Sequence, residues 1–176
     1  MDDGLTQHEG LYDPRRDERD ACGVGFVAHV RGTASHEIVR QGLTLLENMS
    51  HRGAVGCDPC SGDGAGLVVQ LPHEFFRREV AQLGVELPRP GGYAVGMVFL
   101  PTDAGERRAC ELVLENIVEE EGQHILGWRD VPANLDQVGP VARAAAPVFR
   151  QVFIARGRNT DKKSFERKLY VIRRQA

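Results

Sequence analysis

The chain has 176 residues, a formal net charge of −3, 41% apolar residues and 27% charged residues. This length suffices for one domain with a sizeable core, and the composition is that of an ordinary globular protein. The small negative charge gives no electrostatic reason to expect nucleic acid or an anionic membrane as a partner. Four cysteines in a chain this long do not make a disulfide scaffold, and no run of residues approaches the length of a membrane helix. We therefore expect a cytoplasmic protein that binds neither nucleic acid nor membrane.

Residues 1–21 are predicted to be a polar leader that is disordered or loosely held. They contain seven acidic residues and lack the apolar core that a secretory signal peptide needs. Such a composition cannot bury enough apolar surface to offset the entropy of ordering the chain.

The first half of the chain after this leader is predicted to be rich in extended structure. Residues 22–30 alternate small and apolar side chains, which predicts a strand. A helix is predicted from about residue 36 to 49, with Ser35 as its N-cap. The glycine-dense residues 50–66 are too broken for regular structure over most of their length, and strand character returns over residues 65–71.

The second half alternates predicted helices and strands. A short amphipathic helix is bracketed by Pro72 and Pro88, and Asp103 begins a longer helix with Glu106 at capping-box spacing. We expect that longer helix to turn four residues inward, namely Ala109, Leu112, Val113 and Ile117. Strands are predicted over residues 93–100, 124–131 and 148–155, and a last helix over residues 161–174, with Phe165, Leu169 and Ile172 at helical spacing. Strands and helices therefore both occur, and several neighbouring strands are joined by helices.

Cys22 is the first candidate for chemistry. It stands at the first position of a predicted strand, directly after the polar leader. If the peptide bond before it is cut, a free α-amino group lies a few bonds from the sulfur. An α-amino group has a pKa of about 8 and can act as a general base near neutral pH. A thiol with its own base is the arrangement of covalent acyl-transfer catalysis, although a lone cysteine is more often a small buried hydrophobic residue.

Arg52 is the second candidate. It follows a predicted helix and precedes Gly53, so its side chain is placed to point into a cleft and pair with a carboxylate through two hydrogen bonds. The alternative is a solvated cation that complements the helix dipole. The glycine-rich residues 62–66 are predicted to form a structural turn. They lead into a strand, whereas phosphate-binding loops lead from a strand into a helix.

Cys57 and Cys60 have the CxxC spacing of metal and redox sites. A structural zinc requires a second pair of ligands, and a redox CxxC normally begins a helix, where the dipole lowers a thiol pKa. Glycines follow this pair instead. A thiol or zinc protein that uses Cys57 and Cys60 is therefore kept as a minor alternative.

Three motifs taken together carry a resemblance to a known family. Residues 20–26 (DACGVGF), 49–54 (MSHRGA) and 61–66 (SGDGAG) closely resemble the beginning of glutamate synthase large subunits. Residues 127–132 (GWRDVP) and 147–151 (PVFRQ) also look like that family. That region of the family is its glutaminase domain, a class II glutamine amidotransferase with the N-terminal-nucleophile hydrolase fold.

The resemblance implies an α+β fold, namely a four-layer αββα sandwich of which this chain holds the N-terminal part only. Residues 1–21 then correspond to a propeptide-like leader, and residues 22–176 to a partial glutamine amidotransferase domain. The implied role of Cys22 is to attack the side-chain amide of glutamine, giving a thioester, ammonia and finally glutamate. Arg52 matches the family's active-site arginine, and Gly53 with the turn at residues 62–66 is implied to support the pocket.

The resemblance also implies partners that lie outside this chain. They are glutamine as substrate, the downstream portion of the large subunit, and a small subunit or ferredoxin. FMN and an iron–sulfur cluster are implied for the full-length enzyme and no cofactor for this chain. The Asn-Gly pair of the family's oxyanion hole is absent from the sequence.

Loss of one oxyanion donor costs a hundredfold or more in rate, about 3 kcal/mol. We therefore expect little or no glutaminase activity from the isolated chain. The alternative to an active enzyme is a truncated fragment or split-gene module that needs a downstream chain. A sheet that lacks strands is expected to leave an exposed edge prone to pairing.

Overall fold

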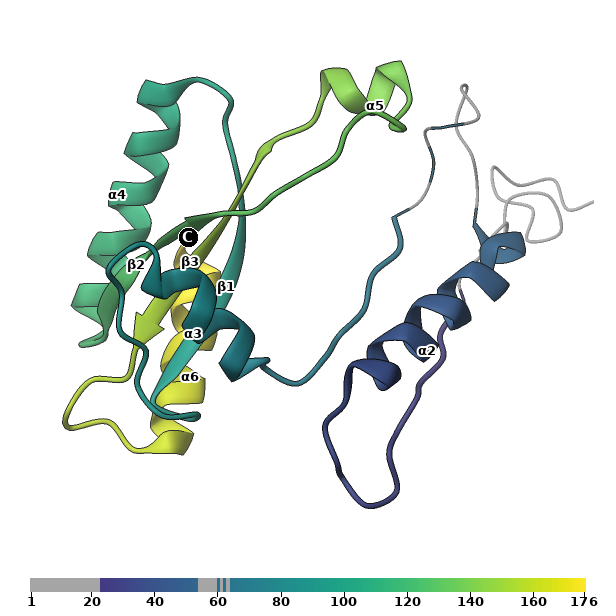
Figure 1. The fold of residues 1–176 in the computed structure, drawn as a ribbon. Helices are drawn as coiled ribbons and strands as arrows, with labels where there is room; N and C mark the ends of the chain where they lie inside the picture. Colours follow the sequence, from purple (N-terminus) through teal and green to yellow (C-terminus); the bar gives the residue numbers. More distant parts are fainter. Residues whose placement is uncertain (1–22, 54–59, 61, 63) are drawn as a thin grey trace, which may run out of the picture. The chain divides into compact units, whose positions relative to one another are not determined.

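The computed structural model describes residues 23–53, 60, 62 and 64–176, and it divides into two compact units. Unit 1 is Met1–Val68 and unit 2 is Val69–Ala176 (Figure 1). No helix in the described part of the chain is both long and apolar enough to cross a bilayer.

Unit 1 is built around one helix, α2 (His36–Asn48), followed by a single 3-10 turn, η1 (Ser50–Arg52). Ser35 occupies the N-cap position as predicted, but its side chain makes no capping hydrogen bond. The sequence predicts strands over residues 22–30 and 65–71, but neither the described residues 23–30 nor residues 65–71 form a strand. Their alternating sequence favours an extended chain, but a strand exists only where a neighbouring chain satisfies its backbone groups.

The extended segments of unit 1 lie close to α2 through two glycines. A Cβ built on Gly25 would come within 2.7 Å of a Leu45 methyl carbon, and one on Gly42 within 3.1 Å of a Leu67 methyl carbon. Gly42 is the one buried residue of α2. The absence of side chains at these positions therefore lets the helix and the extended chain approach each other closely.

Unit 2 contains a three-stranded antiparallel sheet with strand order β1-β3-β2. The strands are β1 (Tyr93–Leu100), β2 (His124–Asp130) and β3 (Val148–Ala155), close to the predicted ranges. Because β1 and β2 both run antiparallel to the central β3, they are parallel to each other and are joined by a helical crossover. This is a split β-α-β arrangement, and with its helices it confirms an α+β fold.

Helices cover both faces of this sheet (Figure 1). Helix α3 (His73–Ala81) packs Phe76 and Val80 against Tyr93 and Phe153 on one face. On the other face, α4 (Ala104–Glu120) and α6 (Lys162–Gln175) pack against Val152 and Ile154 of β3. The α6 residues Phe165, Leu169 and Ile172 contact this core, as their spacing predicts. A fourth helix, α5 (Pro140–Ala144), is absent from the sequence prediction because one turn is too short to show periodicity.

The predicted inward face of α4 is largely wrong. Leu112 and Val113 are exposed, and the buried residues are Glu111, Leu114 and Val118; of the predicted set, Ile117 contacts the core. The sequence has apolar residues on two overlapping faces of this helix. The face that is buried in the structure also contains Glu111, and a charged residue normally indicates a solvent-exposed face. Burial of Glu111 is tolerated because two arginines neutralise it.

A network of charged groups ties α4 to the sheet. Glu111 makes ion pairs with Arg150 of β3 and with Arg108, at 3.2 Å for the latter. Arg108 also contacts Glu115 at 2.9 Å, and Trp128 donates its indole N–H to Glu115 at 2.8 Å. The pKa of Glu115 lies below its ordinary value, chiefly because of the hydrogen bond from Arg108.

The N-termini of α4 and α6 are each capped by an aspartate. Asp103 accepts a hydrogen bond from the Glu106 backbone N–H at 2.9 Å, which confirms the predicted start of α4. Asp161 accepts from the backbone N–H groups of Lys163 and Ser164 at the start of α6. These hydrogen bonds lower the pKa of Asp161, with Ser164 contributing most. Such caps contribute about 1 kcal/mol each to helix stability.

Candidate active site

Cys22, the predicted nucleophile, lies outside the described residues. The structure describes only the residues that follow it. Residues 23–29 run extended beside α2. The contact between Gly25 and Leu45 lies three residues after Cys22. Any larger residue at position 25 would meet the Leu45 side chain, so α2 lies close to the segment that follows the predicted nucleophile.

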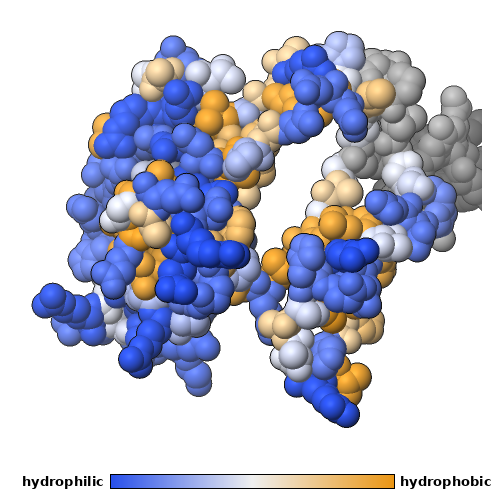
Figure 2. Space-filling model, viewed as in Figure 1, coloured by the Kyte–Doolittle hydropathy of each residue, from blue (hydrophilic) through white to orange (hydrophobic). Residues whose placement is uncertain are grey.

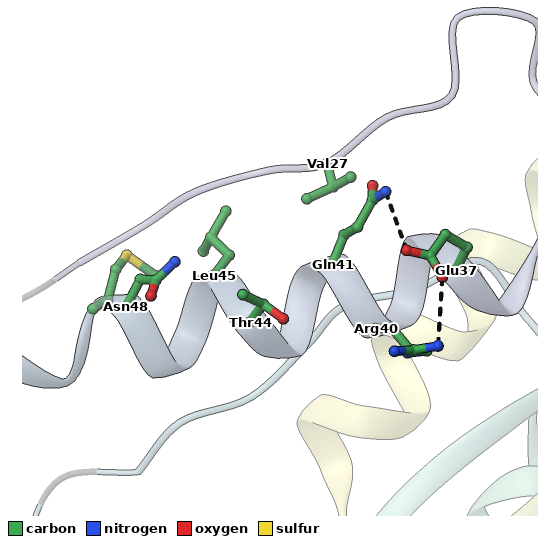
Figure 3. Close-up of a pocket in the computed structure, with 8 residues that line it drawn as sticks. Val27, Glu37, Arg40, Gln41, Thr44, Leu45 and Asn48 are labelled. Carbon is green, nitrogen blue, oxygen red and sulfur yellow. Dashed lines mark hydrogen bonds and ion pairs between the residues drawn. The ribbon is translucent and has the colours of Figure 1, made fainter.

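An open groove of about 390 Å³ lies between this segment and α2 (Figure 3). Val27 and Leu45 provide apolar walls, and Met49 lies at the C-terminal end of the helix. The polar lining comes from residues on α2, namely Glu37, Arg40, Gln41, Thr44 and Asn48. The groove therefore offers amide and hydroxyl groups beside an apolar surface, which suits a small polar ligand.

The charged end of the groove is internally paired. Arg40 lies 3.8 Å from Glu37, and Gln41 donates its side-chain N–H to Glu37 at 3.5 Å (Figure 3). These side chains are well exposed, so water screens the ion pair and it contributes little to stability. Asn48 and Thr44 lie further along the same groove.

Arg52 and Gly53, the predicted supporting residues, lie where α2 ends. Arg52 is the last residue of η1, and the placement of its side chain lies outside the described part of the chain. Gly53 caps this turn by donating its backbone N–H to the carbonyl of Ser50 at 3.1 Å. Its φ of −89° and ψ of 145° are open to any residue, so the backbone conformation alone does not require glycine there.

The polar residues Gln41, Thr44 and Asn48 are not singled out by the sequence. They recur at intervals of three and four along α2, which places them on one helical face. That spacing is the available signal, but it is also the ordinary pattern of a solvated helix face. Only the position of residues 23–29 beside the helix distinguishes the two interpretations.

The CxxC pair is half described, because Cys57 lies outside the described residues and Cys60 is exposed. Among the residues that the structure does describe, no three His, Cys, Asp or Glu side chains lie together as a metal site would need. Cys110 belongs to α4 in the other unit.

Comparison with known protein families identifies the class of protein to which the chain belongs. Residues 22–176 match the family model of the class-II glutamine amidotransferases. The chain therefore belongs to the class-II glutamine amidotransferase family.

Individual relatives are consistent with that family. The chain is 49% identical over 175 residues to the glutamate synthase [NADPH] large chain of Bacillus subtilis, across 98% of this chain and 11% of that protein. It is 39% identical to the glutamate synthase [NADH] of Schizosaccharomyces pombe, across 98% of this chain and 8% of the relative. It is 40% identical to the ferredoxin-dependent glutamate synthase 1 of Arabidopsis thaliana, across 89% of this chain and 10% of the relative. The chain thus spans about a tenth of the length of these relatives.

Proposed function

We propose that this chain is the glutaminase part of a glutamate synthase, with Cys22 as the nucleophile. The observation that carries the proposal is that the family match begins at residue 22, the cysteine that the sequence singles out. The similarity to glutamate synthases covers nearly the whole chain, which supports the particular branch of the family.

In the proposed reaction, the peptide bond before Cys22 is first cut, so that the residue carries a free α-amino group. That amine has a pKa of about 8 and accepts the thiol proton. The thiolate attacks the glutamine side-chain amide carbon, a C–S bond forms, and the C–N bond breaks. The protonated amine returns its proton to the leaving nitrogen, which departs as ammonia. Water then hydrolyses the thioester to glutamate and regenerates the thiol.

Supporting roles are proposed for groups of unit 1. Arg52 orders the surroundings of the nucleophile, and the backbone at Gly53 and at residues 62–66 supports the pocket. Residues 1–21 are proposed to be a removable leader and residues 22–176 a partial amidotransferase domain. The αββα sandwich is the proposed complete fold, to which the downstream portion of the longer protein contributes the oxyanion donors.

Transfer of the ammonia to 2-oxoglutarate is proposed for the longer protein. FMN and an iron–sulfur cluster are implied there, with a small subunit or ferredoxin as the further partner. Iron–sulfur clusters are held by several cysteine thiolates. The described residues include two cysteines, Cys60 and Cys110, which are fewer thiolates than such a cluster needs.

The test is complementation in trans. The chain is coexpressed with the segment of the Bacillus subtilis large chain that follows its matched region, and glutamine-dependent ammonia release is measured. We expect activity from the pair and little or none from the chain alone. Intact mass should show loss of residues 1–21 in the active sample.

Two cysteine variants make the test specific. Cys22→Ala should abolish ammonia release, because it removes the proposed nucleophile, whereas Cys60→Ala should retain it. Full ammonia release by the Cys22→Ala pair would contradict the proposal. Loss of activity in Cys60→Ala alone would instead favour the thiol or zinc alternative.

A further inference from the structure

Two contacts between a leucine and a glycine join α2 to the extended segments that precede and follow it in the sequence. Leu45 of α2 lies against Gly25, where a Cβ would come within 2.7 Å and 2.8 Å of the two leucine methyl carbons. Figure 3 shows the Leu45 side chain pointing from α2 toward residues 23–29. In the second contact the roles are reversed, because Leu67 of the later segment lies against Gly42 of the helix, 3.1 Å from the position of a Cβ. Each leucine therefore occupies space that a side chain on the facing residue would need.

Gly42 is the more unusual of the two glycines, because it lies in the interior of α2. Glycine destabilises a helix interior relative to alanine, so its presence there calls for a physical reason. The close approach of Leu67 supplies one, and Gly42 is also the one buried residue of the helix. Residues three apart are neighbours on a helix surface. Through Gly42 and Leu45, adjoining parts of α2 therefore contact both extended segments.

The two segments follow the motifs that carry the family resemblance. Gly25 comes three residues after Cys22, and Leu67 comes directly after the glycine-rich residues 62–66. Val24 and Phe26, on either side of Gly25, are both nearly 90% exposed, so burial of these neighbours does not hold the segment to the helix. The distance between α2 and the segment that follows the nucleophile therefore depends on the contact at Gly25.

We propose that Gly25 and Leu45 are positioning residues for Cys22, and that Gly42 and Leu67 position the glycine-rich turn in the same way. The proposal rests on the proposed function of Cys22 as the nucleophile. An attacking thiolate must meet the amide carbon at a defined distance and angle, and a misplacement of about 1 Å can cost about a hundredfold in rate. The four residues act through the separation between α2 and the two segments rather than through contact with the substrate.

The test is a size swap in the coexpressed pair that is used to test the proposed function. Gly25→Val adds three carbons beside Leu45, and a leucine in a helix has few rotamers with which to move aside. We expect kcat for ammonia release to fall about tenfold or more while KM changes less than about threefold, because the nucleophile is misplaced and no substrate contact is removed. The double variant Gly25→Val/Leu45→Ala removes three carbons again, so it should recover most of the lost kcat.

A matched control uses another leucine of the same helix. Leu43 is 48% exposed, and Leu43→Ala should neither change kcat by itself nor restore it in Gly25→Val/Leu43→Ala. Gly42→Ala separates positioning from stability. Alanine favours the helix, so the denaturant midpoint should stay the same or rise, whereas kcat should fall severalfold because the added methyl group pushes Leu67 away. A purely structural role would move the midpoint and kcat in the same direction.

Limited proteolysis measures the Gly25 contact without glutamine. Chymotrypsin cleavage after Phe26 requires the segment to leave α2, so Gly25→Val should be cleaved about threefold or more faster than Gly25→Val/Leu45→Ala. Both variants carry valine at position 25, so the protease meets the same residues beside Phe26.

Three results overturn the proposal. They are a wild-type kcat in Gly25→Val, recovery of kcat by Leu43→Ala as well as by Leu45→Ala, and equal cleavage rates in Gly25→Val and the swap. A wild-type pair that releases no ammonia contradicts the proposed function instead. The cleavage rates then decide by themselves whether Leu45 holds the segment in place.

Discussion

Unit 1 and unit 2 differ in how their apolar residues are used. In the described residues, every buried large apolar side chain lies in unit 2, between Phe76 and Ile172. In unit 1, Val24 and Phe26 are nearly 90% exposed, and Gly42 is the buried residue of its helix. Figure 2 shows apolar surface on the part of the molecule that contains α2.

This difference suggests that the residues that stabilise the fold and the residues proposed for the reaction lie in different units. Unit 2 has two core clusters, one on each face of its sheet, and therefore the contacts that make a fold cooperative. Unit 1 holds the motifs of the amidotransferase family at residues 49–54 and 61–66, but few of its own described side chains are packed. We infer that unit 2 sets the measured stability of the chain, whereas unit 1 sets the proposed reactivity.

The strongest test of this inference compares two phenylalanines. Phe153 is fully buried in β3, whereas Phe26 is nearly fully exposed in unit 1. Phe153→Ala should lower the free energy of unfolding by about 3–5 kcal/mol, because it removes buried surface and leaves a cavity. Phe26→Ala should change it by less than about 0.5 kcal/mol. Urea denaturation followed by circular dichroism measures both. Equal losses would mean that Phe26 is as well packed as Phe153 in solution, which would contradict the inference.

The same division decides what the sequence can predict. The strands of unit 2 are predictable because their ends coincide with turns and charges, and α6 because Phe165, Leu169 and Ile172 follow one face. The buried face of α4 is not predictable, since the burial of Glu111 depends in part on an ion pair with Arg150, which lies 39 residues away in the sequence. Long-range ion pairs of this kind leave no local periodicity.

The wrong predictions in unit 1 have another cause. The alternation in residues 22–30 predicts a strand, and this prediction is wrong for the described residues 23–30, because a strand depends on a pairing partner that local sequence does not specify. Cys22 and the groove on α2 show the same limit at the candidate site. Position and residue type point to the nucleophile, whereas Gln41 and Asn48 become candidates only through their place beside residues 23–29.

A pair of glycines gives a smaller and sharper test. A Cβ on Gly157 would collide with the backbone carbonyl oxygen of Gly122, whereas a Cβ on Gly25 meets only the end of the Leu45 side chain. Backbone cannot move aside as a side chain can. Gly157→Ala should therefore cost about 1–3 kcal/mol of unfolding free energy, and Gly25→Ala less than about 1 kcal/mol. Denaturant midpoints of the two variants measure the difference. A larger loss for Gly25→Ala would show that unit 1 is packed more rigidly than its exposure indicates.

The smallest expected effect compares two glutamates in ion pairs. Glu115 of unit 2 is held by Arg108 at 2.9 Å and by the Trp128 indole at 2.8 Å, and these groups lower its pKa below the ordinary 4.5. A carboxylate with a lowered pKa stabilises the fold above its ordinary pKa, and this contribution is lost as the pH falls through the folded-state value. Glu37 of unit 1 pairs with Arg40 at 3.8 Å between exposed side chains.

We therefore expect Glu115→Gln to cost about 1 kcal/mol at pH 7 and progressively less below about pH 4, because the wild-type group is then protonated too. Glu37→Gln should cost less than about 0.5 kcal/mol at either pH, since water screens an exposed pair. Urea unfolding of both variants and the wild type at pH 7 and near pH 3.5 gives the four differences. A Glu115→Gln loss that stays constant with pH would show that the side chain acts through packing. A loss that shrinks with falling pH only for Glu115→Gln would place the titrating contribution to stability in unit 2, whereas the proposed nucleophile belongs to unit 1.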